Sequence, residues 1–457
     1  MSKQYFIEPD DVQASPWASE QFVQHLQQFL GPFLVVLDQL LDKRLVRTCV
    51  QTIVAVLEFR HRSNGLLLSE LGAYLDRPAH APAGTKRLSN LLRSPRWSSA
   101  LIDHFLWQQA QGRLTELQQA DEEALAIWDE RVLEKPESLN LEGWCAVRSS
   151  KARRITRIKP GYYHPPAGRP ICVPGMHWLA LLLVGRQGPA TRAAMQWWTT
   201  RGTFASHRRQ EEGWLLGKCM HSWGRTVIHI FDRGFVGSPW LGECLDLRVR
   251  FIMRWVKHYV LQDTQGQTRK AWQITRGKRA FAQRQVWDAR RQQWFQAGVV
   301  AVPVRHPDFR STPLWLVVSR PGNGRPPWYL LTEDPIETEE QAWQVVFAYA
   351  RRWQIEMTWR FDKTELAFES PRLWHWEPRL KLLLLASLAY AFLLSLLDES
   401  WEMLRQWLLR CWCHRTGKRC REAAAPLSRL RWALSRLWLE HAPAPLACHF
   451  ARVSSSG

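Results

Sequence analysis

Short runs of apolar residues recur through the middle of this chain, separated by polar and helix-forming stretches. A strand that is buried in a sheet reads as such a run, about four to eight residues long. A helical pattern at residues 211–222 lies between two of the runs. Strands mixed with helices indicate an α/β core. The predicted strands are residues 124–128, 177–184, 193–199, 226–231 and 251–256.

Helical patterns are expected on both sides of this core. Apolar residues recur at helical spacing in residues 22–41 and 46–59, with an interruption near Gly31 and Pro32. Short strands with Gly and Pro breaks then predict a β-rich insertion, and one long helix follows at about 339–363. We therefore expect a helical region at 1–115, a core at 116–375 interrupted by the insertion at about 260–335, and a helical region at 376–457.

Residues 382–397 form an uncharged run, LLLLASLAYAFLLSLL, between Lys381 and Asp398. A helix that spans a membrane usually needs about 20 apolar residues. The run is shorter than that, so a buried core helix is favoured over a membrane span.

The charge of the chain is strongly unbalanced. It has 62 Lys and Arg against 42 Asp and Glu, a formal net charge of +20. A protein this basic attracts polyanions. Nucleic acid is the leading candidate partner and an anionic membrane surface the second, while a basic but unspecialised protein is the remaining alternative.

One predicted helix in the N-terminal region has a polar side suited to DNA. It opens near residue 85 after a turn, RPAHAPAG, and places three leucines on one face. Such a helix could pack on a core and present cations and an amide to DNA, although a solvated amphipathic helix has the same pattern. The candidate DNA-contacting residues are Lys86, Arg87, Asn90 and Arg93. We expect the 1–115 region to bind DNA.

The nine cysteines are irregularly spaced, and the first residues lack the form of a signal peptide. Reduced thiols and a cytoplasmic location are therefore expected. Cys411, Cys413, His414 and Cys420 could bind zinc, but their spacing matches no common zinc pattern, so this site stays open. No glycine-rich phosphate loop is found, so no nucleotide cofactor is expected.

Three acidic residues stand where metal-dependent chemistry could use them. Asp129 and Asp232 each follow a predicted strand, and Glu356 lies in the long helix. Phosphodiester cleavage by two metal ions needs carboxylates that hold the ions about 3.5–4 Å apart. Oxygen ligands suit Mg²⁺, and also Mn²⁺. An acid after a strand is common, however, and Glu130 stands directly beside Asp129.

The residues around Glu356 in the predicted helix support its selection among the many acids of the chain. Tyr349, Arg352, Glu356 and Lys363 are spaced by three, four and seven residues, and these steps place all four along one helix face. A carboxylate between two cations could bind a metal and grip phosphates. A solvated helix with an ordinary Arg352–Glu356 pair is the alternative.

These residues resemble the DDE transposases of the insertion-sequence-four group, whose helix carries a Y-R-E-K signature. All four signature positions match, and Trp353 stands where that group often has a tryptophan. Asp129 in AIWDERVLEKP and Asp232 in IHIFDRGF resemble the first and second aspartates of the group. The resemblance covers about residues 120–375.

The resemblance implies an RNase H-like core with Mg²⁺ as cofactor and Mn²⁺ as a substitute. Asp129, Asp232 and Glu356 would be the metal ligands. Tyr349, Arg352 and Lys363 would contact phosphates, and Trp353 would pack near a distorted DNA end. The implied activity is cleavage at transposon ends and joining of 3′-hydroxyls to target DNA, by a homodimer with no membrane partner. A bacterial member would associate with the nucleoid.

Two alternatives to this activity stay open: a metal-dependent nuclease without strand transfer, and a catalytically silent DNA-binding protein derived from a transposase. A basic segment soon after Asp129 favours DNA in each case, because its cations could neutralise phosphates near the site. An exposed basic hairpin is the other interpretation of this segment. The candidate residues in it are Lys151, Arg153, Arg154 and Arg157.

Overall fold

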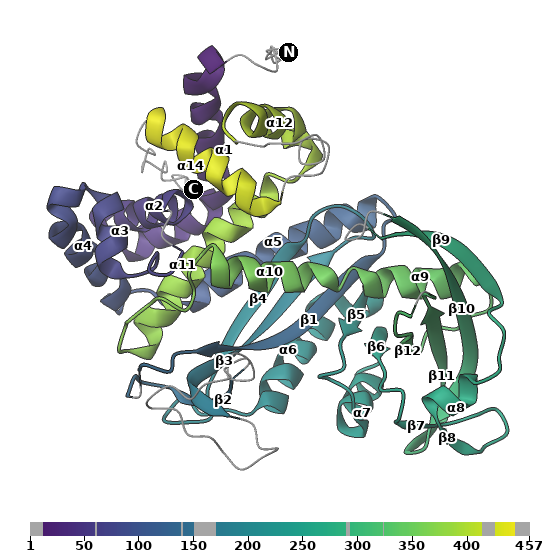
Figure 1. Ribbon diagram of the computed structural model, residues 1–457. Coiled ribbons are helices and arrows are strands. Elements are labelled where there is room, and N and C mark those ends of the chain that lie inside the picture. Colours follow the sequence, from purple (N-terminus) through teal and green to yellow (C-terminus); the bar gives the residue numbers. More distant parts are fainter. Residues whose placement is uncertain are drawn as a thin grey trace, which may run out of the picture.

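The computed structural model describes residues 12–59, 62–138, 140–149, 171–288, 293–322, 324–413 and 426–443. N-terminal helices lead into a mixed sheet, and the C-terminal helices return to the N-terminal ones (Figure 1). The N-terminal helices are α1 (Ser15–Leu40), α2 (Lys43–Glu58), α3 (Leu68–Leu75), α4 (Ala81–Arg93) and α5 (Ala100–Gln119).

The core sheet has the RNase H-like arrangement that the resemblance implies. Its strands follow the order β4-β3-β1-β5-β6. β3 runs antiparallel to β1 and β4, whereas β5 is parallel to β1 and β6 is parallel to β5. The α/β fold class is therefore confirmed. The strands are β1 (Ala124–Glu134), β3 (Cys172–Val184), β4 (Thr191–Trp198), β5 (Val227–Phe231) and β6 (Phe251–Arg254), with the short β2 (Cys145–Arg148) paired to β3.

The first strand is longer than the sequence predicts. The prediction ends it at Trp128, but β1 continues through Asp129 to Glu134. Pairing with β3 is continuous from Leu125 opposite Val184 to Glu134 opposite Gly175, so the polar half of β1 is held by its neighbour. Asp129 therefore lies within the strand. The expectation that it stands at the strand's exit is wrong.

The predicted β-rich insertion is confirmed, and it extends the core sheet. Its last strand pairs antiparallel with β6, so the described residues form one sheet of 12 strands. Its elements are β7 (Val260–Gln262), β8 (Thr268–Lys270), α8 (Ala271–Thr275), β9 (Ala282–Asp288), β10 (Gln293–His306), β11 (Phe309–Arg320) and β12 (Trp328–Thr332).

The long helix predicted at 339–363 is two helices, α9 (Glu339–Ala350) and α10 (Trp353–Thr364). Between them the backbone N–H of Arg352 donates to Tyr349 O at 3.0 Å, and that of Ile355 donates to Arg352 O at 3.2 Å. Bonds to the third preceding residue tighten the turn and end the α-helical pattern. Two further helices, α6 (Arg208–Trp223) and α7 (Ser238–Asp246), pack on the face of the sheet opposite to α10 (Figure 1).

Two helix boundaries in the N-terminal region also differ from prediction. α1 is continuous past Gly31, with Pro32 inside it. The carbonyl that Pro32 leaves without a donor belongs to Gln28, which is exposed, so water can reach it. α4 begins at Ala81, because Pro82 is tolerated in a first helical turn. Gly84 lets α4 cross α3 closely, since a Cβ there would stand 2.2 Å from the Gly72 carbonyl oxygen.

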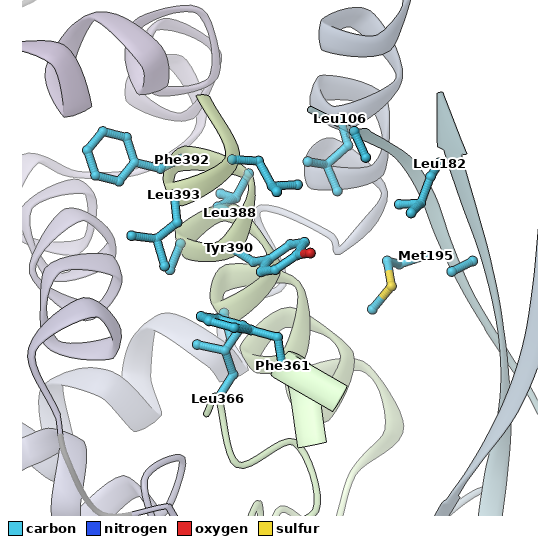
Figure 2. Close-up of a cluster of buried hydrophobic side chains, with 14 of the residues drawn as sticks. Leu106, Leu182, Met195, Phe361, Leu366, Leu388, Tyr390, Phe392 and Leu393 are labelled. Carbon is cyan, nitrogen blue, oxygen red and sulfur yellow. The ribbon is translucent and has the colours of Figure 1, made fainter. Parts of the chain in front are cut away.

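Residues 382–395 of the apolar run form the C-terminal part of α11 (Trp376–Ser395), which packs against α2, α4, α5, α14 and β4. Figure 2 shows Leu388, Tyr390, Phe392 and Leu393 of this helix among side chains from α5, β3, β4 and α10. By length and composition α11 could cross a membrane, but 83% of its most apolar window is buried in the protein. It is a core helix, as predicted. The remaining C-terminal helices are α12 (Glu402–Cys411) and α14 (Leu427–Glu440).

Candidate active site

The register of β1 and β5 brings the two predicted aspartates to the same level of the sheet. Ile127 pairs with Ile230 in the parallel ladder. Asp129 and Asp232 each come two residues later, and in a strand such residues return to the same face. Asp232 follows the last residue of β5, as predicted, and its Oδ1 accepts the backbone N–H of Gly234 at 2.6 Å.

Asp129 is held in a buried position by α10. It is 5% exposed. Its Oδ2 accepts the indole N–H of Trp359 at 2.8 Å, and its Oδ1 accepts the backbone N–H of Glu130 at 3.0 Å. Trp359 in turn stacks on Trp178 of β3, with ring centroids 4.5 Å apart. The packed indole therefore fixes the orientation of this carboxylate.

Glu130, the neighbouring acid, points away from this group. Its Oε2 lies 2.7 Å from Nε of Arg208 on α6, and its Oε1 lies 3.4 Å from Nδ1 of His177 on β3. Alternation along β1 places the two acids on opposite faces of the strand, and Asp129 is the one that faces α10.

Glu356 lies in the first turn of α10 and is linked to Asp129 by a shared guanidinium. Its Oε1 accepts from both terminal nitrogens of Arg352, at 3.2 and 3.1 Å. Its Oε2 accepts from Nη2 of Arg131 at 2.6 Å, and Nε of the same guanidinium lies 3.4 Å from Asp129 Oδ2. Arg131 therefore joins the strand carboxylate to the helix carboxylate.

The pKa shifts show how closely these groups interact. Burial raises the pKa of Asp129 to about 7; Asp232 adds to the rise, and Arg131, Trp359 and Arg352 oppose it. Burial lowers the pKa of Arg352, but nearby negative groups, Asp129, Glu356 and Asp232 among them, raise it above its ordinary value overall. Arg352 thus contacts Glu356 and lies in an electrostatic environment to which all three acids contribute.

Tyr349 belongs to the same group, although it lies on α9 and its predicted partners lie on or next to α10. Burial raises the pKa of its phenol, and the positive charges of Arg352 and Arg254 oppose the rise. The helix break at Arg352 therefore does not separate the first signature residue from the others.

Two more of the predicted DNA-contacting residues, Lys363 and Trp353, lie at the edge of this group. Lys363 donates from Nζ to Val132 O at 2.8 Å and lies 3.8 Å from Glu369 Oε1. It is thus tied to the backbone of β1, three residues beyond Asp129. Trp353 is 59% exposed, one residue after Arg352. Its indole is free to contact a ligand that approaches Arg352.

Two residues of the group were missed by the sequence reasoning, Arg131 and Trp359. The signal was present for both. Arg131 is two residues after Asp129 on a strand and so shares its face. Trp359 is three residues after Glu356 on a helix and so lies beside it.

The three acids are of the residue type that holds the metal implied by the resemblance, but their present positions do not form an ion site. Asp129, Asp232 and Glu356 offer only carboxylate oxygens, which Mg²⁺ and Mn²⁺ prefer. Within the described part of the chain, no three His, Cys, Asp or Glu side chains approach closely enough to hold one ion. Both Glu356 oxygens and one of Asp129 contact guanidinium groups instead, so Arg131 must move for the carboxylates to share an ion.

The other predicted DNA-contacting residues lie outside this group. Lys86, Asn90 and Arg93 are exposed on α4, and Arg87 is half-buried beside α2. The basic-segment residues Lys151, Arg153, Arg154 and Arg157 lie outside the described residues. So do His414 and Cys420 of the candidate zinc set, whereas Cys411 is half-buried at the end of α12 and Cys413 is buried.

A mixed sheet, with the buried Asp129 linked through Arg131 to Glu356, defines an α/β protein with a polar site where the sheet meets α10. No protein-family model matches the sequence, and no curated protein matches it. One solved structure that the chain is similar to is the piggyBac transposase synaptic complex with hairpin DNA. The identity is 11% and the TM-score 0.40, over 95% of this chain and 87% of that chain. A likeness this low carries no argument about fold or activity.

Proposed function

We propose that this protein is a DDE-type DNA transposase that cuts at transposon ends and joins the 3′-hydroxyls to target DNA. The observation that carries the proposal is that Arg131 links Asp129 of β1 to Glu356 of α10, while the parallel pairing of β1 with β5 sets Asp232 at the level of Asp129. The resemblance of the Tyr349, Arg352, Glu356 and Lys363 signature to the insertion-sequence-four group supports the same function.

Asp129, Asp232 and Glu356 would hold divalent cations, Mg²⁺ in the first place and Mn²⁺ as a substitute. Such ions, when bound, activate the attacking water or hydroxyl and stabilise the leaving oxygen. Trp359 orients Asp129 through the indole N–H, and its packing on Trp178 excludes water from that side of the carboxylate.

The remaining residues of the site would bind the DNA strand. Arg352 is placed to contact a phosphate that approaches the carboxylates, because a guanidinium can form two parallel bonds to phosphate oxygens. Tyr349 would donate its hydroxyl to the same strand. The exposed indole of Trp353 would pack against an unstacked base or sugar at the DNA end.

The partners of this function are the transposon ends and the target, both double-stranded DNA. The net charge of +20 supports such a partner. We further propose that the protein acts as a homodimer, so that one chain serves each transposon end, and that it works in the cytoplasm at the nucleoid.

A strand-transfer assay tests the proposal. The full chain is incubated with a short duplex that carries the terminal inverted repeat, with Mg²⁺ and with a supercoiled target plasmid. Joined products are expected. Cleavage without joining would identify a metal-dependent nuclease, and binding without cleavage would identify a catalytically silent DNA-binding protein; either result overturns the transposase.

A further inference from the structure

Arg208, the first residue of α6, contacts the acid that follows Asp129 on β1 and faces the other side of the sheet. Its Nε lies 2.7 Å from Oε2 of this acid, Glu130, and donates to Oε1 of Glu212 at 2.8 Å. Glu212 stands one turn further along α6 and is buried. The guanidinium of Arg208 is therefore held between a carboxylate of the strand and one of its own helix.

The same guanidinium reaches the turn that follows β5. Its Nη2 donates to the carbonyl oxygen of Gly234 at 3.1 Å, and its central carbon lies 5.5 Å from the ring centroid of Phe235. Phe235 is fully buried, so the far end of the turn is anchored in the core. Arg208 therefore joins the strand that carries Asp129 to the turn that follows Asp232.

Gly234 in this turn holds the carboxylate of Asp232. Its backbone N–H donates to Asp232 Oδ1 at 2.6 Å. A Cβ at Gly234 would stand 2.9 Å from that oxygen and 3.5 Å from Nη2 of Arg208, so the carboxylate, the turn and the guanidinium are closely packed. Arg208 thus fixes Gly234 through its carbonyl, and Gly234 fixes the Asp232 carboxylate through its N–H.

We propose that Arg208 is a positioning residue of the candidate active site, which sets the place of the Asp232 carboxylate relative to β1. It acts through Gly234 and takes no part in the reaction itself. Glu130 gains a role as well, because it holds Arg208 beside the strand of Asp129. The inference rests on the proposed function, in which Asp232 is one of the metal ligands.

Hydrogen exchange at the backbone amide of Gly234 tests this positioning without metal or DNA. The exchange rate is measured in the full chain by mass spectrometry with fragmentation that resolves single amides. Wild type is compared with Arg208→Ala and with Arg209→Ala. Arg209 is the matched control, because it carries the same charge and pairs with the same Glu212 at 2.8 Å, but its guanidinium lies over the ring of Trp240.

Arg208→Ala is expected to exchange the Gly234 amide about fivefold faster than wild type, which is the effect of one ordinary hydrogen bond. Arg209→Ala should exchange it at the wild-type rate. Equal rates in wild type and Arg208→Ala would overturn the positioning role. If Arg208→Ala loses its circular dichroism spectrum, Arg208→Lys replaces it. Lysine keeps the charge but has no planar fork to span the two carboxylates and the turn, so this variant should also exchange faster.

Binding of Mn²⁺ to the same proteins, measured from the electron paramagnetic resonance signal of the free ion, tests the consequence for the site. Arg208→Ala should bind Mn²⁺ about tenfold more weakly than wild type and Arg209→Ala, because groups that orient a metal ligand are worth about 10–100-fold in affinity. Loss of a positive charge alone would favour the cation, so weaker binding cannot come from charge.

Faster exchange with unchanged Mn²⁺ affinity would overturn the role of Arg208 in the active site. If wild type binds no Mn²⁺, the metal site of the proposed function fails, while the exchange rates still decide whether Arg208 holds the turn after Asp232.

Discussion

Arg131 has an unusual position among the residues of the site, because one guanidinium contacts a carboxylate of the strand and one of the helix. Its Nη2 lies 2.6 Å from Glu356 and its Nε lies 3.4 Å from Asp129. Its side chain is 39% exposed, so it can swing out at little cost. A divalent ion could bind the same two carboxylates only if the Arg131 guanidinium moved away from them.

Arg131→Ala should make the protein more responsive to Mg²⁺. Without the guanidinium, Asp129 and Glu356 repel each other until a divalent ion replaces it. We expect Mg²⁺ to raise the melting temperature of the variant about 1 °C more than that of wild type, which corresponds to about 1 kcal/mol for a chain of 457 residues. Differential scanning fluorimetry with and without MgCl₂ measures this difference.

Arg250→Ala is the matched control, because Arg250 also bridges two acids, Glu123 and Asp334, away from the site. It should show the wild-type response to Mg²⁺. Equal Mg²⁺ shifts in all three proteins would contradict the role given to Arg131.

The sequence predicted most residues of the candidate site but not their contacts. The signature spacing identified Glu356 and Arg352, and the strand-then-acid pattern identified Asp129 and Asp232. Arg131 and Trp359 were missed, although each stands at a spacing that returns to the site. Their roles depend on which face of β1 meets α10, and this packing joins residues more than 200 positions apart.

At the scale of the elements, a buried ion pair fixes α10 against the sheet. Nη2 of Arg192 on β4 donates to both oxygens of Asp362 on α10, at 2.9 and 2.7 Å, and both residues are fully buried. The Arg192 guanidinium also lies 4.3 Å from the ring centroid of Tyr390, whose hydroxyl is 2.9 Å from Thr358 Oγ1. This network joins α10 to β4 and α11 and so sets the position of Glu356.

Asp362→Asn should therefore be strongly destabilising. Removing one partner leaves the other charge buried and uncompensated, which costs about 3–5 kcal/mol. Urea denaturation measures the loss in free energy of unfolding. Glu340→Gln is the control, because Glu340 pairs with Arg284 on the surface, where solvent screening leaves such a pair little effect on stability. If the two variants lost similar stability, the ion pair would not be what holds α10.

The predicted elements failed where pairing or hydrogen bonding between neighbours decided their limits. The apolar half of β1 was predicted. Its polar half is a strand because it pairs with β3, and a local sequence pattern does not show pairing between distant segments. The turn between α9 and α10 was missed because the residues around Arg352 all form helices readily. Only the bonds of Arg352 and Ile355 to the third preceding residue reveal it.

At the scale of the whole molecule, the first and last helical regions form a single body. α2 packs against both α11 and α14. Ser435 on α14 donates its hydroxyl to Glu58 O at 2.8 Å, and Arg431 donates from Nη2 to Val56 O at 3.2 Å. The sequence showed two helical regions at the ends of the chain but could not show that they meet, because their contacts span more than 370 residues.

Glu58, the last residue of α2, should make the free energy of unfolding depend on pH. Burial raises the pKa of Glu58 from 4.5 to about 7, so between these values the folded protein holds a proton that the unfolded chain has lost. Stability from this group is therefore full below about pH 4.5 and is lost as the pH rises through 7.

Glu58→Gln, which resembles the protonated side chain, should be more stable than wild type at pH 8 by about 1–3 kcal/mol and equal to it near pH 4. Chemical denaturation at the two pH values measures the difference. Glu402→Gln, in the first turn of α12, is the control. A Glu58 variant whose advantage did not change with pH would show that this carboxyl ionises normally in the folded protein.

The central claim is that Glu356 completes a metal-dependent cleavage site together with Asp129 and Asp232. Its most direct test is cleavage of end-bearing duplex DNA in Mg²⁺ by wild type, Glu356→Gln and Glu116→Gln. Glu116 pairs with Arg113 on α5 at 2.9 Å, much as Glu356 pairs with Arg352, and serves as the control. We predict that Glu356→Gln loses cleavage but binds the DNA as wild type does, and that Glu116→Gln cuts normally. Cleavage by Glu356→Gln at the wild-type rate would contradict the account.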